Sequence, residues 1–237
     1  LIMSAVVWAL TAGLSLAGSH SVIRMGTEGA YPPWNYVDDN GEVAGFEREL
    51  GDELCKRAEL KCEWVINDWD SIIPNLVSGN YDTIIAGMSI TDERQEKIDF
   101  TSNYTQPDPS SYVAASEGAD LSGGIIAAQS NTIQAAYIAG TGATLVEFAT
   151  PEETISAVRN GEADAVLADT SYLNPIVAED SGLMFAGDKV LIGGGVGMGI
   201  RKSDADLRDK FTAAINSMKA DGTLNALIVK HEIGETF

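Results

Sequence analysis

The chain is short of positive charge. Its 237 residues include 15 lysine and arginine residues against 35 aspartate and glutamate residues, which gives a formal net charge of −20 at pH 7. Nucleic acids and anionic membrane surfaces bind proteins through clusters of lysine and arginine, so a chain this acidic repels both. We therefore expect no nucleic-acid partner.

Long hydrophobic runs are missing from the body of the chain, so no internal membrane span is expected. The apolar stretch at residues 2–17 carries no charge and leads into small residues at 17–19. That pattern is typical of the hydrophobic region and cleavage site of a secretory signal. We expect residues 1–19 to be a truncated signal peptide, without its basic start, and the mature protein to be exported. A buried N-terminal helix is the alternative.

Cysteine and histidine are scarce. The cysteines are Cys55 and Cys62, and the histidines, His20 and His231, are remote from them in sequence. The cysteine spacing does not suit zinc and the histidines are remote, so we expect no metal site. No cofactor is expected either. Two cysteines this close in an exported protein most simply form a disulfide, with two free thiols as the alternative.

Residues 87–94, with the sequence GMSITDER, indicate a binding site. The apolar run before them predicts a buried strand, and Gly87 lets the backbone come close to a small ligand. A helix start at residue 91 then places Arg94 in the first helical turn, near Ser89 at the strand end. A forked guanidinium, a hydroxyl and free backbone amides together make a carboxylate site. The alternative is a surface arginine paired with a neighbouring acid, Asp92 or Glu93.

The spacing of apolar residues predicts alternating strands and helices. Expected strands lie at 22–26, 62–66, 83–86, 125–128, 145–148 and 165–168, and expected helices at 46–58, 72–77, 132–139 and 150–160. Such alternation indicates an α/β fold with parallel strands, in which ligands bind outside the carboxyl ends of the strands. The loop at 27–35 contains two prolines with Tyr31 and Trp34, which suit the wall of a pocket.

Two stretches of the chain echo each other. Residues 78–85 and 160–167 each contain a helix end, a glycine, two further residues, an aspartate and an apolar strand. The repeat predicts that the chain forms two similar lobes, each with a polar functional group at the end of a strand. The first lobe offers Ser89 with Arg94, and the second offers Asp169. The alternative for Asp169 is a cap for a helix that begins at the next residue.

The glycine-rich residues 190–199 fit neither a phosphate-binding loop nor a dinucleotide-binding fingerprint. We interpret them as a strand that crosses back between the lobes. Helices predicted around residues 207–218 and 224–228 would then pack on the first lobe. The expected domains are residues 20–105 together with 196–237 for lobe 1, and residues 106–195 for lobe 2.

Six motifs occur in a characteristic order. They are residues 26–34 (GTEGAYPPW), 45–47 (GFE), 68–76 (DWDSIIPNL), 89–94 (SITDER), 197–202 (GMGIRK) and 220–223 (ADGT). Together they resemble the polar amino-acid binding proteins of bacterial ABC importers, and most of all the lysine/arginine/ornithine, histidine and arginine binders. The resemblance implies a two-lobed periplasmic binding protein fold (type II) with two hinge strands and the ligand in the interlobe cleft. It also implies a periplasmic location.

The resemblance further implies a role for each matching residue. Arg94, Thr132 and the backbone amides of Asn131 and Thr132 would bind the α-carboxylate of the ligand. The α-ammonium would contact Asp169, Ser89 and the carbonyl of Gly87. Tyr31 and Trp69 would contact the side chain of the ligand. The family's disulfide matches Cys55 and Cys62. Glu28 lies where the basic-residue binders carry an acid for the distal cation. We therefore expect a basic ligand, arginine first and then lysine, ornithine or histidine; the alternative is that Glu28 faces solvent.

The expected function is that of a monomeric binding protein, not an enzyme, which delivers a free amino acid to a membrane-embedded ABC permease. A binder of glutamine or another polar amino acid is one alternative. An exported, dehydratase-like enzyme on the same scaffold is another, and it would need a general acid or base in the cleft. The cleft offers Glu28 and Asp169 for that role but no histidine.

Overall fold

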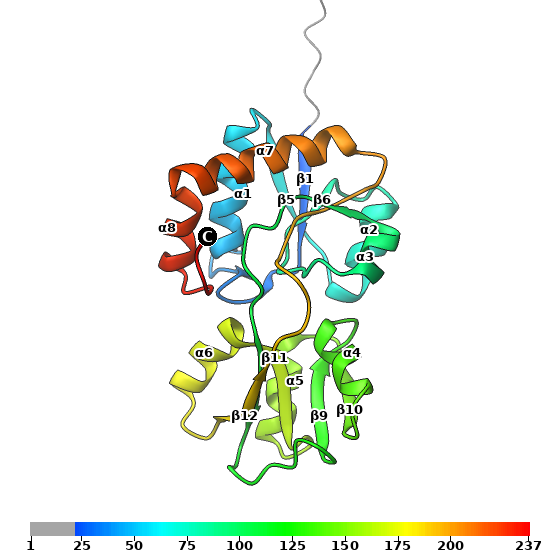
Figure 1. Cartoon of the computed structure of the whole chain (residues 1–237), viewed down its shortest axis with the longest axis vertical. Coiled ribbons are helices and arrows are strands. Elements are labelled where there is room, and N and C mark those ends of the chain that lie inside the picture. Colours follow the sequence, from blue (N-terminus) through cyan, green and yellow to red (C-terminus); the bar gives the residue numbers. More distant parts are fainter. Residues whose placement is uncertain (1–21) are drawn as a thin grey trace, which may run out of the picture.

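The computed structural model describes residues 22–237, and the signal peptide predicted at residues 1–19 lies outside the described residues. The described chain forms two lobes, each built on one five-stranded sheet (Figure 1). We call lobe 1 the part around the sheet of order β5-β1-β6-β13-β7, and lobe 2 the part around the sheet of order β10-β9-β11-β8-β12.

Lobe 1 takes its sheet from both ends of the described chain. The strands are β1 (Ile23–Thr27), β5 (Cys62–Ile66), β6 (Thr83–Ile84), β7 (Asp99–Phe100) and β13 (Gly199–Ile200). Its helical elements are α1 (Phe46–Arg57), η1 (Trp69–Ser71), α2 (Ile72–Val77), α3 (Asp92–Lys97), α7 (Ala205–Asp221) and α8 (Thr223–Lys230). Strand β1 runs parallel to β5 and β6, whereas β13 is antiparallel to β6 and β7.

The helices of lobe 1 cover its sheet with apolar faces. Helix α1 buries Leu50 and Leu54 completely, and α7, which covers the helix predicted around residues 207–218, buries Phe211, Ile215 and Met218. A small sheet, β2 (Ala30–Tyr31), β3 (Asn35–Val37) and β4 (Val43–Ala44), lies in the connection between β1 and α1. The sequence had predicted only a loop over the first part of this connection.

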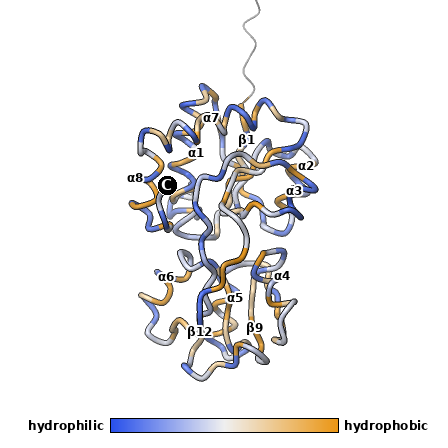
Figure 2. The backbone as a smooth tube through the Cα atoms, in the orientation of Figure 1, coloured by the Kyte–Doolittle hydropathy of each residue, from blue (hydrophilic) through white to orange (hydrophobic). Residues whose placement is uncertain are grey.

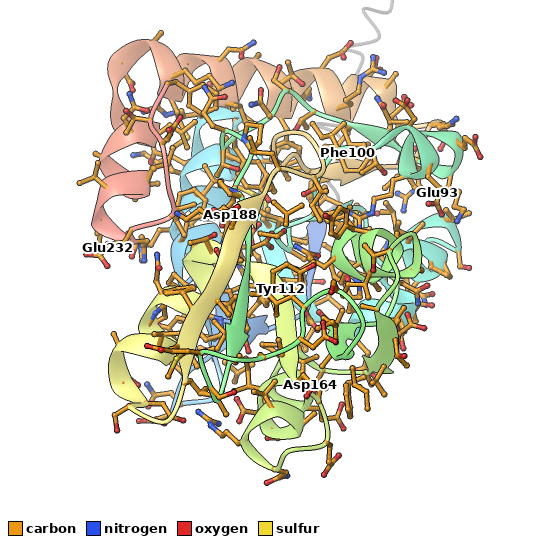
Figure 3. The ribbon with its side chains drawn as sticks, turned by 60° about the horizontal axis from the view of Figure 1, so that its bottom comes forward. Glu93, Phe100, Tyr112, Asp164, Asp188 and Glu232 are labelled. Atoms are coloured by element: carbon orange, nitrogen blue, oxygen red, sulfur yellow. A yellow bond between two sulfur atoms is a disulfide. The ribbon has the colours of Figure 1, made fainter. Side chains whose placement is uncertain are left out.

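Lobe 2 comes from one continuous stretch of chain. Its strands are β8 (Ser110–Ala114), β9 (Ile125–Gln129), β10 (Thr144–Phe148), β11 (Ala165–Asp169) and β12 (Met184–Val190), and its helices are α4 (Ile133–Ala139), α5 (Pro151–Arg159) and α6 (Thr170–Glu179). The hydrophobic β9 (Figure 2) lies between β10 and β11 and pairs in parallel with both. Strand β8 pairs antiparallel with β11 and with β12, beside which it lies in Figure 3. The sequence did not predict β8 or β12.

Two segments join the lobes, one from β7 to β8 and one from β12 to β13 (Figure 1). They touch through a bridge between Thr105 and Val196, where the Tyr104 amide donates to the Val196 carbonyl at 2.7 Å. The prediction of one strand over residues 190–199 was wrong: only its ends belong to strands. Glycine is needed in the middle of this stretch, because a Cβ on Gly195 would lie 2.6 Å from the Thr105 carbonyl oxygen of the other segment. The exact domain limits stay a prediction.

The predicted disulfide between Cys55 and Cys62 is confirmed, with the two Cα atoms 6.3 Å apart. It joins the last turn of α1 to the first residue of β5. Among residues 22–237, no helix combines the length and the hydrophobicity that a membrane span requires.

Candidate functional site

A cavity between the lobes brings the predicted residues together. Its space is about 360 Å³, open solvent at its mouth included. The lining residues are Glu28, Tyr31, Trp69, Ala86, Gly87, Ser89, Arg94, Gln129, Thr132, Ile133, Gln134 and Asp169. Of the nine predicted ligand-binding residues, only Asn131 is outside this lining, and it borders a larger groove that continues from the cavity. The strand-end residues of both lobes thus face one space, as expected for an α/β sheet.

Arg94 is held by the helix start that the sequence predicted. The Thr91 side chain caps α3 by accepting from the Arg94 amide at 3.2 Å. The guanidinium donates to the carbonyl oxygens of Ser89 at 2.9 Å and Asn131 at 3.3 Å. The surface ion-pair alternative was wrong, because Glu93 instead approaches Lys97, at 3.8 Å. Burial lowers the pKa of Arg94 to about 10, which still leaves it charged at neutral pH.

Asp169 closes the second lobe's side of the cavity. Its carboxylate accepts from the Tyr31 hydroxyl at 2.9 Å and from the Gln134 side-chain amide at 2.8 Å. Asp169 occupies the position before α6, but its side chain makes no capping hydrogen bond, so the capping alternative does not describe its contacts. Burial, followed by repulsion from Asp108, raises the pKa of Asp169 to about 7.

Glu28 is a second buried carboxylate. Its residue surface is 9% exposed, and its Oε1 accepts from the Gln129 side-chain amide at 2.6 Å. The alternative that Glu28 faces solvent was therefore wrong. Burial is the main reason that the pKa of Glu28 rises to about 7, and the hydrogen bond from Gln129 opposes that rise.

Aromatic rings lie beside these charges. The Tyr31 ring stacks on Tyr172, with centroids 4.2 Å apart and planes 10° apart. The Arg94 guanidinium carbon lies 5.4 Å from the centroid of the Trp69 ring, in cation–π geometry. Both Tyr31 and Trp69 line the cavity. Their predicted contact with a ligand side chain stays a prediction.

Asn131 bridges the lobes beside the cavity. Its backbone has a positive φ of 57°, a conformation that asparagine tolerates better than most residues. Its carbonyl accepts from Arg94 and, at 3.4 Å, from the Trp69 indole, while its side-chain amide donates to Asp70 at 2.9 Å. The next residue, Thr132, caps α4 by accepting from the Ala135 amide.

A buried network that the sequence did not reveal supports the loops of lobe 1. The Glu47 carboxylate is fully buried and accepts from the Gly87 amide at 2.7 Å, the Asn35 side chain at 2.6 Å and the Tyr104 hydroxyl. Asn35 in turn accepts from the Gly29 amide at 2.7 Å. One carboxylate thus positions Gly87, whose φ is 60°, together with the loop that carries Glu28.

Sequence reasoning also missed Gln129 and Gln134. A signal for both was present, because Gln129 directly follows the predicted strand 125–128 and Gln134 lies in the first turn of the helix predicted at 132–139. Both side chains donate to the cavity carboxylates, Gln129 to Glu28 and Gln134 to Asp169. The cavity therefore combines two carboxylates, one guanidinium and aromatic faces. Within residues 22–237, no group of three or more histidine, cysteine, aspartate or glutamate side chains is arranged to hold a metal ion.

Proteins of similar sequence and structure are binding proteins. The chain is 33% identical, over 251 aligned positions, to the lysine/arginine/ornithine-binding periplasmic protein of Escherichia coli strain K12, covering 98% of this chain and 95% of that relative. It is 32% identical over 218 positions to the L-arginine-binding protein of Pseudomonas aeruginosa, covering 84% of this chain and 83% of that relative.

A solved structure extends this likeness. The crystal structure of a periplasmic His/Glu/Gln/Arg/opine family-binding protein from Silicibacter pomeroyi in complex with lysine is 76% identical, with a TM-score of 0.88, and the match covers 89% of this chain and 96% of that one. The expected two-lobed, type II periplasmic binding fold is thereby confirmed. A family model matches residues 23–234, and the chain belongs to the bacterial extracellular solute-binding proteins, family 3.

Proposed function

We propose that this protein binds one free basic amino acid between its lobes, in the periplasm, and delivers it to the permease of an ABC importer. The observation that carries the proposal is the charge set of the cavity. Two buried carboxylates, Glu28 and Asp169, and one guanidinium, Arg94, face the same space.

This charge set complements a basic amino acid. Lysine, arginine and ornithine each carry two cations and one carboxylate at neutral pH, so every charge in the cavity would gain a partner. Glutamine would leave one buried carboxylate unpaired, and glutamate would add a further like charge, and both outcomes are costly at a desolvated site. The lysine in the Silicibacter pomeroyi complex and the ligands named for the Escherichia coli relative support the same class of ligand.

Each charge has a proposed partner. Arg94 binds the α-carboxylate, because a guanidinium binds a carboxylate through two parallel hydrogen bonds. Thr132 and the backbone amides of Asn131 and Thr132 donate further hydrogen bonds to the same carboxylate. The α-ammonium is assigned to Asp169, with Ser89 and the carbonyl of Gly87 beside it. The distal cation is assigned to Glu28, with Tyr31 and Trp69 along the methylenes.

The mechanism we infer is closure around the ligand. Arg94 and Glu28 belong to lobe 1, whereas Asp169 and Thr132 belong to lobe 2, so a ligand bound to both sets stabilises the closed arrangement. The family and the relatives are binding proteins. We infer that this protein likewise performs no catalysis and acts as a monomer.

The direct test is calorimetric titration of the purified protein with arginine, lysine, ornithine, histidine, glutamine and glutamate. We expect the basic amino acids to bind at least tenfold more tightly than glutamine, a difference of about 1.4 kcal/mol or more. Preference for glutamine or glutamate would refute the ligand class. An NMR spectrum that shows a chemically altered ligand after incubation with the protein would refute the non-enzymatic role.

A further inference from the structure

We propose that Gln129 is the positioning residue for Glu28. In the closed cleft its side-chain amide orients the Glu28 carboxylate toward the distal cation of the ligand and leaves the negative charge of Glu28 intact. The inference rests on the proposed function and adds a specificity residue from lobe 2 to a charge that lobe 1 supplies.

The first observation is the way the Gln129 amide is fixed. Gln129 is the last residue of β9 and is 8% exposed. Its Nε2 donates to Glu28 Oε1 at 2.6 Å and to the Ala149 carbonyl at 3.0 Å. Because both hydrogens of the amide have an acceptor, the orientation of the amide is determined by lobe 2 and by Glu28 together.

The second observation is what the contact leaves free on Glu28. The bond engages Oε1, and no described residue donates a hydrogen bond to Oε2. A neutral amide orients a carboxylate without cancelling its charge. A lysine or arginine at position 129 would instead occupy the carboxylate and compete with the cation of the ligand.

The third observation is the sign of the charges around Glu28. Burial is the largest influence on its pKa, and the charges that contribute most to the shift are negative. These charges are Asp68, Asp70 and Glu47. Arg94, Asp169 and Tyr172 face it across or beside the cavity, and the Arg94 guanidinium donates to the carbonyl oxygens of Ser89 and Asn131 and not to Glu28. The ligand is thus the source from which Glu28 gains a positive partner.

The contact also depends on closure, because its donor and acceptor belong to different lobes. When the lobes separate, the Glu28 carboxylate loses its Gln129 donor. A ligand with a distal cation therefore finds Glu28 held in its binding geometry only in the closed form, which couples recognition of the cation to closure.

The test is a double-mutant cycle measured by calorimetry with lysine at constant pH. Gln129→Met, which keeps the length and removes the donor, is made in the wild-type background and in the Glu28→Gln background. We expect Gln129→Met to weaken lysine binding about tenfold in the wild type and less than about twofold in Glu28→Gln, because its effect acts through the carboxylate. Ser171→Ala is the control: it removes another interlobe hydrogen bond, from the Trp34 indole at 2.7 Å, together with the bond from the Ser171 hydroxyl to Asp108 at 2.6 Å, and Ser171 makes no hydrogen bond to Glu28.

The outcomes separate the two claims. Ser171→Ala should weaken binding by the same factor in both backgrounds, and Gln129→Met should not. Equal losses for Gln129→Met in both backgrounds, or no loss in either, would overturn the positioning role. Failure of the wild-type protein to bind any basic amino acid would overturn the proposed function as well. If Gln129→Met does not fold, Gln129→Asn, whose amide is one methylene too short, takes its place in the cycle with the same expectation.

Discussion

Closure of the ligand-free protein should depend on pH, and the direction of this dependence follows from the two carboxylates of the cleft. In the closed form, burial raises the pKa of Glu28 from 4.5 and that of Asp169 from 3.8 to about 7. When the cleft opens, we expect both carboxyl groups to return to water and their pKa values to return to the ordinary range. The closed form therefore binds more protons than the open form between about pH 4 and pH 7, so ligand-free closure becomes less favourable as the pH rises through that range.

The size of this pH effect on closure can be calculated for a pH range in which ordinary carboxylates do not titrate. Between pH 8 and pH 6, a carboxyl group with a closed-state pKa of about 7 and an open-state value near 4 shifts the closed-to-open ratio about tenfold, or about 1.4 kcal/mol. Glu28 and Asp169 together should shift it about a hundredfold toward closure. Asp108, whose pKa burial also raises, acts in the same direction if opening exposes it.

Small-angle X-ray scattering of the ligand-free protein measures this shift as a change in radius of gyration. We expect the radius at pH 6 to approach that of the lysine-bound protein, and the radius at pH 8 to be larger. Glu28→Gln removes one of the two titrating groups, so its pH dependence should be about tenfold weaker. A radius that is the same at both pH values, or larger at pH 6, would refute the reasoning.

The remaining predictions concern single side chains. Arg94→Lys keeps the charge but loses the fork, so calorimetry should show at least a tenfold weaker affinity for lysine, about 1.4 kcal/mol; wild-type affinity would remove Arg94 from the site. Glu28→Gln should cost on the order of 1–3 kcal/mol with arginine and little with glutamine, and equal losses for both would contradict the assignment of the distal cation. Replacing Cys55 and Cys62 by serine should lower the free energy of unfolding in urea by about 2–3 kcal/mol, given the short loop. Unchanged stability would contradict this value, and mass spectrometry of the unreduced, alkylated protein should find no free thiol.

The parts of the site that the sequence predicted were those that depend on local order along the chain. Arg94 was found because a strand, a glycine and a helix cap follow one another within a few residues. Asp169 was found because it ends a strand in the second of two similar stretches. Sequence order placed each residue at a strand end of its own lobe, where ligands of α/β sheets bind. Their assignment to one cavity between the lobes came from the resemblance to the amino-acid binding proteins.

The parts that the sequence did not predict depend on contacts between distant segments. Strand β12 contains Gly187 and Asp188 and is largely exposed, so its pattern does not resemble a buried strand. Strand β8 begins with two buried serines, and Ser111 is satisfied by a hydrogen bond to Thr170 that no local pattern signals. Glu47 was quoted only as part of a motif, since a fully buried carboxylate is predictable only once its donors are known.

Selectivity and closure are consequences of one arrangement in this cleft. Each lobe alone holds an incomplete set of charges: lobe 1 has Arg94 and Glu28, and lobe 2 has Asp169. Closing the empty cleft buries two carboxylates against one guanidinium, and the raised pKa values of Glu28 and Asp169 express that cost. A ligand with two cations and one carboxylate removes the cost, whereas a ligand with one cation removes only part of it. The closed state should therefore be most populated with ligands of the matching charge, so that the charge of the ligand determines how fully the lobes close.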